Sequence, residues 1–246
     1  MFDQHFEIFL ADTHESKAIH YSIRYQVYCE EMGFENKDSF PLEQEFDEHD
    51  KYSDHFIVRT RLTGQWVGAM RLIFKNNQLL PVEKHCILTA NVSNDHLNRS
   101  IEISRLCLIK DIRSRIIDTD PPIGLPDENQ EIMKSKNIIP FYGQKHIERS
   151  IIWGLFRAAA VHSKECKIQK WYFLSTRGLA RIIGKTGCNM EQIGQPLNYN
   201  GERIPFEMSV NEILSNPLWL NDFKKDFNLY SVIEAPEIIN TKVMSV

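Results

Sequence analysis

The sequence predicts an α+β fold, in which a mixed and mainly antiparallel sheet is flanked by helices. Short apolar runs with period-two alternation follow one another around glycine-containing turns, as antiparallel strands do. A helical pattern over about 144–166 separates two later runs, which favours a crossover onto the sheet. The chain has 246 residues, of which 42% are hydrophobic and 25% charged, enough for one sizeable core. We expect a main domain over 1–215 with an insertion at 116–142, and a C-terminal tail at 216–246.

The overall composition argues against several classes of protein. A net charge of −4 spread over mixed signs argues against broad binding to nucleic acid or anionic membranes. The five cysteines are odd in number and widely spaced, so neither a disulfide framework nor a thiolate zinc site is indicated. No segment approaches the ~18 uninterrupted apolar residues of a membrane helix. We therefore expect a soluble, cytoplasmic protein without an integral membrane segment.

The N-terminal part predicts one strand and one helix. Residues 6–10 alternate as a short strand. Asp12 and Glu15 have the spacing of a capping box, which starts a helix that runs to about Glu31 before Gly33 ends it. Its core-facing stripe consists of Ile19, Ile23 and Val27.

One flank of this helix carries Arg24, Tyr28 and Glu31 at helical spacing. The helix could therefore present a cation and a phenol together beside the core. A solvated face with one half-buried aromatic ring is the simpler explanation of these residues alone.

A loop rich in acidic residues follows over 35–54. Its carboxylates are Glu43, Glu45, Asp47, Glu48, Asp50 and Asp54, and His49 and His55 lie among them. Such a run can simply solvate itself, but it could also form a pocket for a cationic amine or a site for a hard metal. The loop lacks the spacing and the glycine of a calcium loop and has no His-x-x-x-His pair. We therefore predict no metal site.

The middle of the chain predicts a hairpin and then a central strand. Runs at 56–58 and 66–74 are joined through Gly64, where an antiparallel hairpin needs glycine. The stretch 79–100 has low periodicity and is assigned to irregular structure with one helical turn. The strand at 101–109 contains no turn residue and is rich in β-branched side chains, so we expect it near the middle of the sheet.

The strand at 101–109 carries charge on both predicted faces. Strict alternation places Ile101, Ile103, Arg105, Cys107 and Ile109 on one face, and Glu102, Ser104, Leu106 and Leu108 on the other. Charged groups on a central strand must be paired, hydrogen-bonded or open to a cleft. The strand by itself leaves two explanations open, a buried structural pair and a catalytic role.

The later part of the chain predicts a second half to the sheet. The proline-rich insertion at 116–142 is long enough to be a lid or a mobile segment. An amphipathic helix over 144–166 precedes a strand at 168–174, and further strand candidates lie at 188–193 and 203–210. A short helix between them is predicted to bury Leu179, Ile182 and Ile183 and to carry Arg177, Arg181 and Lys185 on its other side.

Several short patterns occur in a fixed order along the chain. They are Arg24-x-x-x-Tyr28, Phe34, Glu45-x-Asp47-x-x-Asp50, Gly68-x-x-Arg71 and Glu102-x-Ser104-Arg105. Over roughly 5–210 this series resembles the acyl-homoserine-lactone (autoinducer) synthases, which share the fold of the GNAT acyltransferases. The chain is more similar still to the exosortase-associated (PEP-CTERM system) acyltransferases and N-acyl amino acid synthases. Those proteins carry a similar Arg-Tyr-x-Val-Tyr-Cys-x-Glu opening and Glu-Ile-Ser-Arg-Leu strand.

The departures from these families bear on the two substrates. Tyr28 and Phe34 stand where autoinducer synthases more often have Phe and Trp, which argues against S-adenosylmethionine as acceptor. The glycine-rich pyrophosphate loop of coenzyme-A-dependent GNAT enzymes is missing after the central strand. The resemblance therefore favours acyl carrier protein over acyl-CoA as the thioester co-substrate, with no tightly bound cofactor.

The resemblance also implies a role for each group of residues. Glu102 would accept the proton of the attacking amine, and the backbone from Leu106 to Leu108 would offer a bulge N–H to the thioester carbonyl. The residues expected to bind the substrate are Arg24, Tyr28, Phe34, Glu45, Asp47, Asp50, Arg71, Ser104 and Arg105. The acidic loop with Glu45, Asp47 and Asp50 is expected to fold against Arg24 and not to lie free in solvent. Those expected to dock the carrier protein are Arg113, Arg115, Arg177, Arg181 and Lys185, although surface solvation also explains the last three.

The sequence thus predicts an N-acyltransferase that moves a fatty acyl group from a thioester to the amine of an amino acid or related small molecule. One alternative is an acyl-homoserine-lactone synthase that uses S-adenosylmethionine. Another is a non-catalytic acyl- or peptide-binding module on the same fold. Glu102 separates the last alternative from the others, because a binding module has no need of a carboxylate on a central strand.

Overall fold

The computed structural model describes residues 2–89, 99–113, 144–185, 187–199, 201–220 and 222–234. The strands among them are β1 (Phe6–Leu10), β2 (Ser53–Thr60), β3 (Trp66–Phe74), β4 (Ser100–Leu108), β5 (Lys170–Ser175), β6 (Glu191–Gln192), β7 (Leu197–Asn198), β8 (Glu202–Ser209) and β9 (Asn228–Leu229). They form one sheet in the order β6-β8-β5-β4-β3-β2-β1-β9, and β7 pairs with β8. The predicted insertion at 116–142, together with Arg115, lies outside the described residues.

The sheet is mixed and mainly antiparallel, as predicted. Only β4 with β5 and β1 with β9 pair in parallel among the described strands. The strand that carries Glu102 lies in the middle of the order, which confirms the expectation of a central strand. The predicted run at 66–74 coincides with β3, and the predicted run at 188–193 is reduced to the two residues of β6.

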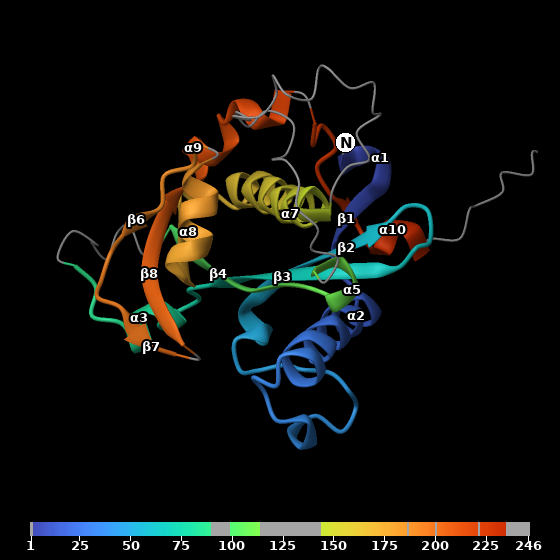
Figure 1. The fold of residues 1–246 in the computed structure, drawn as a ribbon, viewed down its shortest axis with the longest axis horizontal. Helices are drawn as coiled ribbons and strands as arrows, with labels where there is room; N and C mark the ends of the chain where they lie inside the picture. Colours follow the sequence, from blue (N-terminus) through green and yellow to red (C-terminus); the bar gives the residue numbers. More distant parts are fainter. Residues whose placement is uncertain are drawn as a thin grey trace, which may run out of the picture.

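Helices cover both faces of the sheet. The described helices are α1 (Phe2–His5), α2 (His14–Arg24), α3 (Pro81–His85), α5 (Lys110–Arg113), α7 (Gln144–Glu165), α8 (Arg177–Gly184), α9 (Val210–Leu214) and α10 (Ser231–Glu234). The long helix α7 lies on one face, and α2 with the loop that follows it lies on the other (Figure 1). No described helix combines the length and the apolar character needed to cross a membrane.

The apolar side chains of β4 face α7. Ile101 and Ile103 pair with Trp171 and Phe173 of β5, and both of these aromatic rings contact Phe156 of α7. Glu102 alternates to the opposite face, where its strand neighbour is Tyr172. The main core therefore lies between the sheet and α7, and the polar side chains of β4 are left on the α2 side.

The helix over 14–31 differs in two details from its prediction. Its N-cap is Thr13, which forms a capping box with Ser16, whereas Asp12 accepts a hydrogen bond from the N–H of Ser231 at 2.9 Å. The sequence motif for the cap was therefore placed one residue too early. The last turns, Tyr25–Glu31, are π-helical, a local widening that is frequent at functional sites.

One later helix also departs from expectation, and the C-terminal segment packs against the N-terminus. In α8, Ile183 is buried but Ile182 is 41% exposed, so the predicted inner face is narrower than three residues. The C-terminal residues 222–229 return to the N-terminus, where the ring of Phe223 stacks on Phe2 with a centroid separation of 5.2 Å. The short β9 then extends the sheet beside β1.

Candidate active site

A β-bulge interrupts the pairing of β4 with β3. Ala69 pairs with Cys107 and Arg71 pairs with Ser104, so two residues of β4 stand opposite one residue of β3. Arg105 adopts a left-handed backbone with φ of 50°, a conformation that side chains other than glycine, asparagine and aspartate rarely take. The bulge therefore lies at Arg105 and Leu106.

The bulge changes the face of the sheet to which the side chain of Arg105 points. Strict alternation predicted that Arg105 and Ser104 point to opposite faces of the sheet. The side chains instead reach the same cluster. The guanidinium of Arg105 contacts one oxygen of Asp47, and Arg71 donates both to the other oxygen of Asp47 and to the hydroxyl of Ser104. The alternation pattern was wrong here because the extra residue rotates the strand. The resemblance located the bulge N–H from Leu106 to Leu108, whereas Leu108 is already back in regular register with Gly68.

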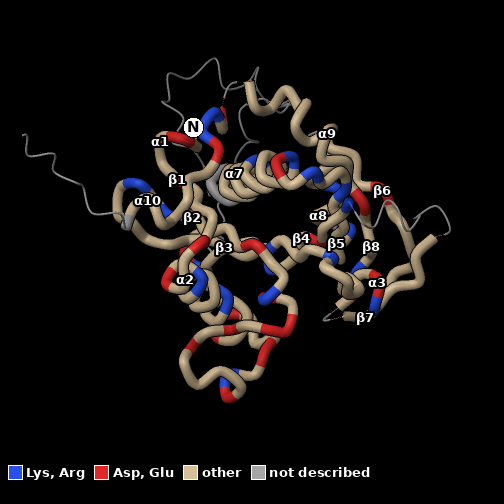
Figure 2. The backbone as a smooth tube through the Cα atoms, turned by 180° about the vertical axis from the view of Figure 1, so that it is seen from behind, with Lys and Arg blue, Asp and Glu red and all other residues tan. Residues whose placement is uncertain are grey.

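Arginines and carboxylates form a dense network on this face, which we call the ion-pair wall. Its members are Arg24, Arg71, Arg105, Glu35, Glu45, Asp47 and Asp50. Figure 2 shows acidic residues gathered along the loop that follows α2. That loop is therefore folded against the sheet and not free in solvent.

Arg24 is the buried brace of the ion-pair wall. It is fully buried on α2, and its guanidinium donates to Glu45 and, at 2.6 Å, to Asp50. Burial alone would lower the pKa of Arg24, but these two carboxylates raise it. The prediction that the acidic loop pairs with Arg24 is confirmed.

Arg71 and Arg105 connect the loop to the central strands. Arg71 donates to Asp47 at 2.6 Å and to the hydroxyl of Ser104 at 2.9 Å. Arg105 binds Glu45 at 3.0 Å and reaches Glu35 at 3.4 Å. Both arginines are thus held by more than one hydrogen-bonding partner, which fixes the orientation of their guanidinium planes.

Asp50 shows how strongly the ion-pair wall stabilises the ionised form of a carboxyl group. Burial would raise the pKa of this carboxyl, but the hydrogen bond from His55 and the charges of Arg24 and Arg71 hold it well below its usual range. His55 contacts Asp50 through Nε2 at 3.0 Å, and burial lowers the pKa of that imidazole. Asp50 is therefore an ionised structural anchor.

Glu102 occupies a very different environment on the same face. Its side chain is 2% exposed, and its Oε2 accepts a hydrogen bond from the N–H of Val82 in the first turn of α3 at 2.7 Å. Burial raises the pKa of Glu102 to about 8, and the Val82 N–H and the charge of Arg71 oppose this only in part. A carboxyl that titrates near neutral pH can both accept and release a proton.

Tyr28 projects from the π-helical turn toward the bulge. Its hydroxyl donates to the carbonyl of Leu106 at 3.4 Å, and the guanidinium of Arg105 lies 5.3 Å from its ring centroid. Burial raises the pKa of this phenol, so Tyr28 stays neutral and acts as a hydrogen-bond donor.

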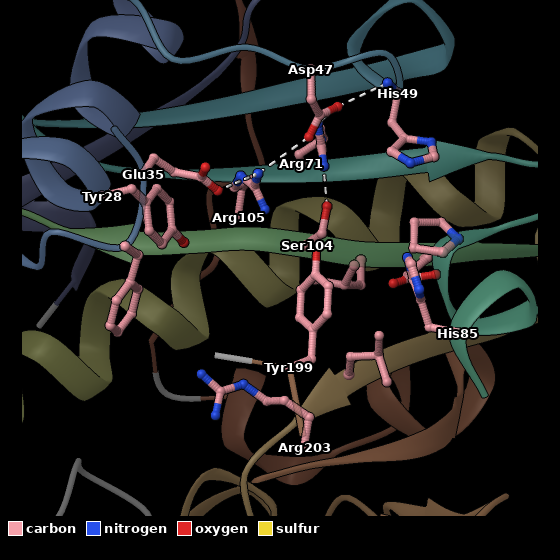
Figure 3. Close-up of a pocket in the computed structure, with 15 residues that line it drawn as sticks. Tyr28, Glu35, Asp47, His49, Arg71, His85, Ser104, Arg105, Tyr199 and Arg203 are labelled. Atoms are coloured by element: carbon pink, nitrogen blue, oxygen red, sulfur yellow. Dashed lines mark hydrogen bonds and ion pairs between the residues drawn. The ribbon is translucent and has the colours of Figure 1, made fainter. Parts of the chain in front are cut away.

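These side chains surround a cavity of about 200 Å³. It is lined by Tyr28, Phe34, Glu35, Asp47, His49, Arg71, Pro81, His85, Glu102, Ile103, Ser104, Arg105, Leu174, Tyr199 and Arg203. In Figure 3, Asp47 and Arg71 lie on one side of it, and Tyr199 and Arg203 lie on the other. The cavity thus has a charged wall from the loop and β3, and a second wall from the β7–β8 hairpin.

The cavity gathers many of the residues singled out from the sequence, but not all of them. Tyr28, Phe34, Asp47, Arg71, Glu102, Ser104 and Arg105 line it. Arg24, Glu45 and Asp50 do not, because they are buried behind the lining in ion pairs with one another. Leu106 and Leu108 also lie outside the lining.

The cationic residues expected to dock a carrier protein lie apart from the cavity lining. Arg177 and Arg181 are exposed on α8, and Lys185 is exposed at its C-cap. Nothing is described of the Arg113 side chain. Sequence reasoning in turn missed His49, His85, Tyr199 and Arg203 as lining residues. Tyr199 and Arg203 flank an Asn-Gly turn, which signals a hairpin but gives no indication of what the hairpin faces.

The fold is that of the GNAT type, and comparisons with known proteins agree. Residues 23–119 match the family model of the acetyltransferase (GNAT) domain. No curated protein sequence matches the chain at a significant level. The likeness at the level of sequence is thus to a GNAT acetyltransferase domain over residues 23–119.

Solved structures extend this likeness over most of the chain. TofI, crystallised with an inhibitor and MTA, gives a TM-score of 0.57 at 15% identity and covers 86% of this chain and 99% of its own. MesI, a CoA-dependent acyl-homoserine lactone synthase, gives 0.56 at 14% identity over 86% and 92%. FeeM, an N-acyl amino acid synthase from uncultured soil microbes, gives 0.50 at 12% identity over 87% and 97%. Identities this low establish the shared fold only.

Proposed function

We propose that the protein is an N-acyltransferase that moves a fatty acyl group from a thioester donor to the amine of an amino acid. The observation that carries this proposal is Glu102, a buried carboxyl with a pKa of about 8 in the same cavity as the ion-pair wall. General bases work best when their pKa lies near the working pH. A binding module on this fold would have no use for such a group.

The reaction follows from these groups. An ammonium acceptor loses one proton, through water, to Glu102 in its carboxylate form, whose share rises as the pH approaches the pKa of about 8. The nitrogen of the acceptor then attacks the thioester carbonyl carbon. The new C–N bond forms as the C–S bond breaks, and the attacking nitrogen loses a second proton. One of the two protons converts the departing thiolate to a thiol, and the other is released to solvent. Backbone N–H groups at the Arg105–Leu106 bulge would bind the oxygen that becomes negative, which is the usual role of an oxyanion hole.

The donor would enter between β4 and β5. Their parallel ladder runs only from Ser100 with Lys170 to Ile103 with Phe173, so β4 continues beyond it toward the bulge. A pantetheine arm can pair with such a strand as an added strand would. The absence of a glycine-rich pyrophosphate loop in the sequence favours acyl carrier protein as donor, docked on the exposed cations of α8.

The acceptor would place its ammonium against Asp47. This carboxylate is 27% exposed, and Arg71 holds its pKa low although burial would raise it. It is thus an ionised, accessible acceptor of hydrogen bonds. The opening motif at 24–31 supports membership of the exosortase-associated acyltransferases. The fold neighbours include acyl-homoserine lactone synthases, one of them solved with SAM, so a lactone synthase that uses S-adenosylmethionine is the second candidate.

A reconstituted reaction tests the proposal. Purified protein is incubated with fatty acyl carrier protein or acyl-CoA and with either the twenty amino acids or S-adenosylmethionine, and products are identified by mass spectrometry. We expect an N-acyl amino acid, formed faster from the carrier protein and more slowly at high salt, because exposed cations are screened. Acyl-homoserine lactone without an N-acyl amino acid would overturn the acceptor, and no product from any combination would overturn the activity.

A further inference from the structure

The arginines of the ion-pair wall are already occupied. Arg24 is bound to Glu45 and Asp50, Arg71 to Asp47 and Asp50, and Arg105 to Glu45, Asp47 and Glu35. A substrate carboxylate would have to displace one of these protein carboxylates to reach a guanidinium there. Because two of them, Glu45 and Asp50, are buried, such displacement would leave an unpaired buried charge, which is strongly unfavourable.

The wall also carries the wrong sign for an anion. Its four carboxylates face three guanidiniums, which leaves one excess negative charge. The cavity next to it contains Glu102, which is largely protonated near neutral pH, and His49, whose pKa is lowered by burial. The wall therefore attracts an ammonium group and repels a carboxylate.

Arg203 lies on the other side of the same cavity. It is half-buried on β8, and Figure 3 shows it with Tyr199 across the cavity from Asp47. Its Nη1 donates to the backbone carbonyl of Glu202 at 3.1 Å. Among the described residues no carboxylate lies within ion-pair distance of Arg203, unlike the other two arginines that line the cavity.

The local hairpin holds Arg203 in this position. Arg203 pairs across the hairpin with Leu197, and Gly201 takes a left-handed φ of 93° in the turn. A side chain at 201 would meet Nη1 of Arg203 at 3.4 Å. The ring of Tyr199 packs beside that of His85, with centroids 5.3 Å apart, and completes this end of the cavity.

We infer that Arg203 binds the carboxylate of the acceptor, while the acceptor's ammonium group faces Asp47 on the opposite wall. The inference rests on the proposed acyl transfer to an amino acid and assigns its two charged ends to opposite sides of the cavity. A guanidinium can hold a carboxylate by two parallel hydrogen bonds, which gives both affinity and orientation. The acceptor is then selected as a zwitterion, and amines without an anionic group are poor substrates.

A paired-acceptor experiment tests this assignment through Arg203→Gln. For each amino acid that serves as acceptor, the matching amino acid amide is also measured. We expect the KM for the amino acid to rise about 10- to 100-fold, as for loss of a charge-assisted contact, whereas the KM for the amide changes less than about threefold. Lys164→Gln, which removes an exposed cation of α7 away from the cavity, should change neither.

Direct binding keeps the test independent of turnover. The same amino acids and amides are titrated against wild type and Arg203→Gln by saturation-transfer NMR. Selective loss of amino acid binding in the variant supports the inference even where no product forms. The missing product would count against the proposed reaction and not against the assignment of Arg203. Equal loss for acid and amide, unchanged binding of both, or a rise only in the KM for the thioester donor would overturn it. The last outcome would assign Arg203 to the phosphate of the donor's phosphopantetheine arm.

Discussion

Asp50 and Glu102 are two buried carboxyl groups on the same side of one sheet, yet their pKa values are shifted in opposite directions. Asp50 lies in the ion-pair wall, where His55, Arg24 and Arg71 keep its pKa well below the usual range against the effect of burial. Glu102 has one backbone N–H and a distant guanidinium, so burial prevails and raises its pKa to about 8.

The difference shows that burial alone does not set protonation. The number of donors aimed at each carboxyl decides whether desolvation is offset. Where donors are many, the group is fixed as a charge and can only support structure. Where they are few, it titrates near neutral pH and is available for proton transfer. The arrangement with many donors occurs at Asp50 in the ion-pair wall, and the arrangement with few donors occurs at Glu102 in the cavity.

Removal of the titrating carboxyl should have the largest effect. Glu102→Gln keeps the size of the side chain and its acceptor for the Val82 N–H, but it cannot take up the amine proton. We expect kcat to fall by roughly 10²–10⁴ while donor binding changes little. Steady-state kinetics with an acyl donor and an amino acid measure this. Activity within a few-fold of wild type would remove Glu102 from the mechanism.

The pH dependence of the same variant sharpens the comparison. The folded pKa of Glu102, about 8, lies above its ordinary value of 4.5. Its contribution to stability is therefore complete below pH 4.5 and is lost as pH rises through about 8. We expect the rate of wild type to rise with pH through about 8, and Glu102→Gln to gain in Tm relative to wild type between pH 5 and pH 9. A Tm difference that does not vary with pH would contradict the raised pKa.

Breaking the wall should destabilise the fold. Arg24→Met leaves the buried carboxylates Glu45 and Asp50 without their main partner, at a cost of about 3–5 kcal/mol in free energy of unfolding. Arg61→Met is the matched control, because Arg61 makes an exposed ion pair with Glu7 worth less than about 1 kcal/mol. Urea unfolding measures both. Similar losses in the two variants would show that the wall is no more structural than a surface pair.

The smallest effect is expected where the wall meets the cavity. Asp47→Asn keeps an acceptor for Arg71 but removes the charge that faces the amine. We expect the KM for the amino acid to rise about tenfold, with a far smaller loss of Tm than in Arg24→Met, since Asp47 is partly exposed. A large loss of Tm with an unchanged KM would show that Asp47, like Asp50, stabilises the fold and does not bind the acceptor.

Much of the local structure could be predicted from local patterns. The run at 66–74 became β3, and the stripe of Ile19, Ile23 and Val27 belongs to one continuous helical segment. The pairing of Arg24 with the acidic loop was also predicted, from the resemblance of the loop to a family pattern and from the opposite charges. The cap at Thr13 was missed by one residue, since Thr13 and Asp12 are both good N-caps.

The sequence by itself determined that a carboxylate would lie on a central strand with acids and arginines nearby, because strand propensity and charge are local properties. Only the tertiary structure decided how those charges are used. The bulge at Arg105 depends on register with β3, and the proton on Glu102 depends on how few donors reach it. Arg203 lies across the cavity from Asp47 only because β8 and the loop after α2, far apart in sequence, fold onto opposite sides of it.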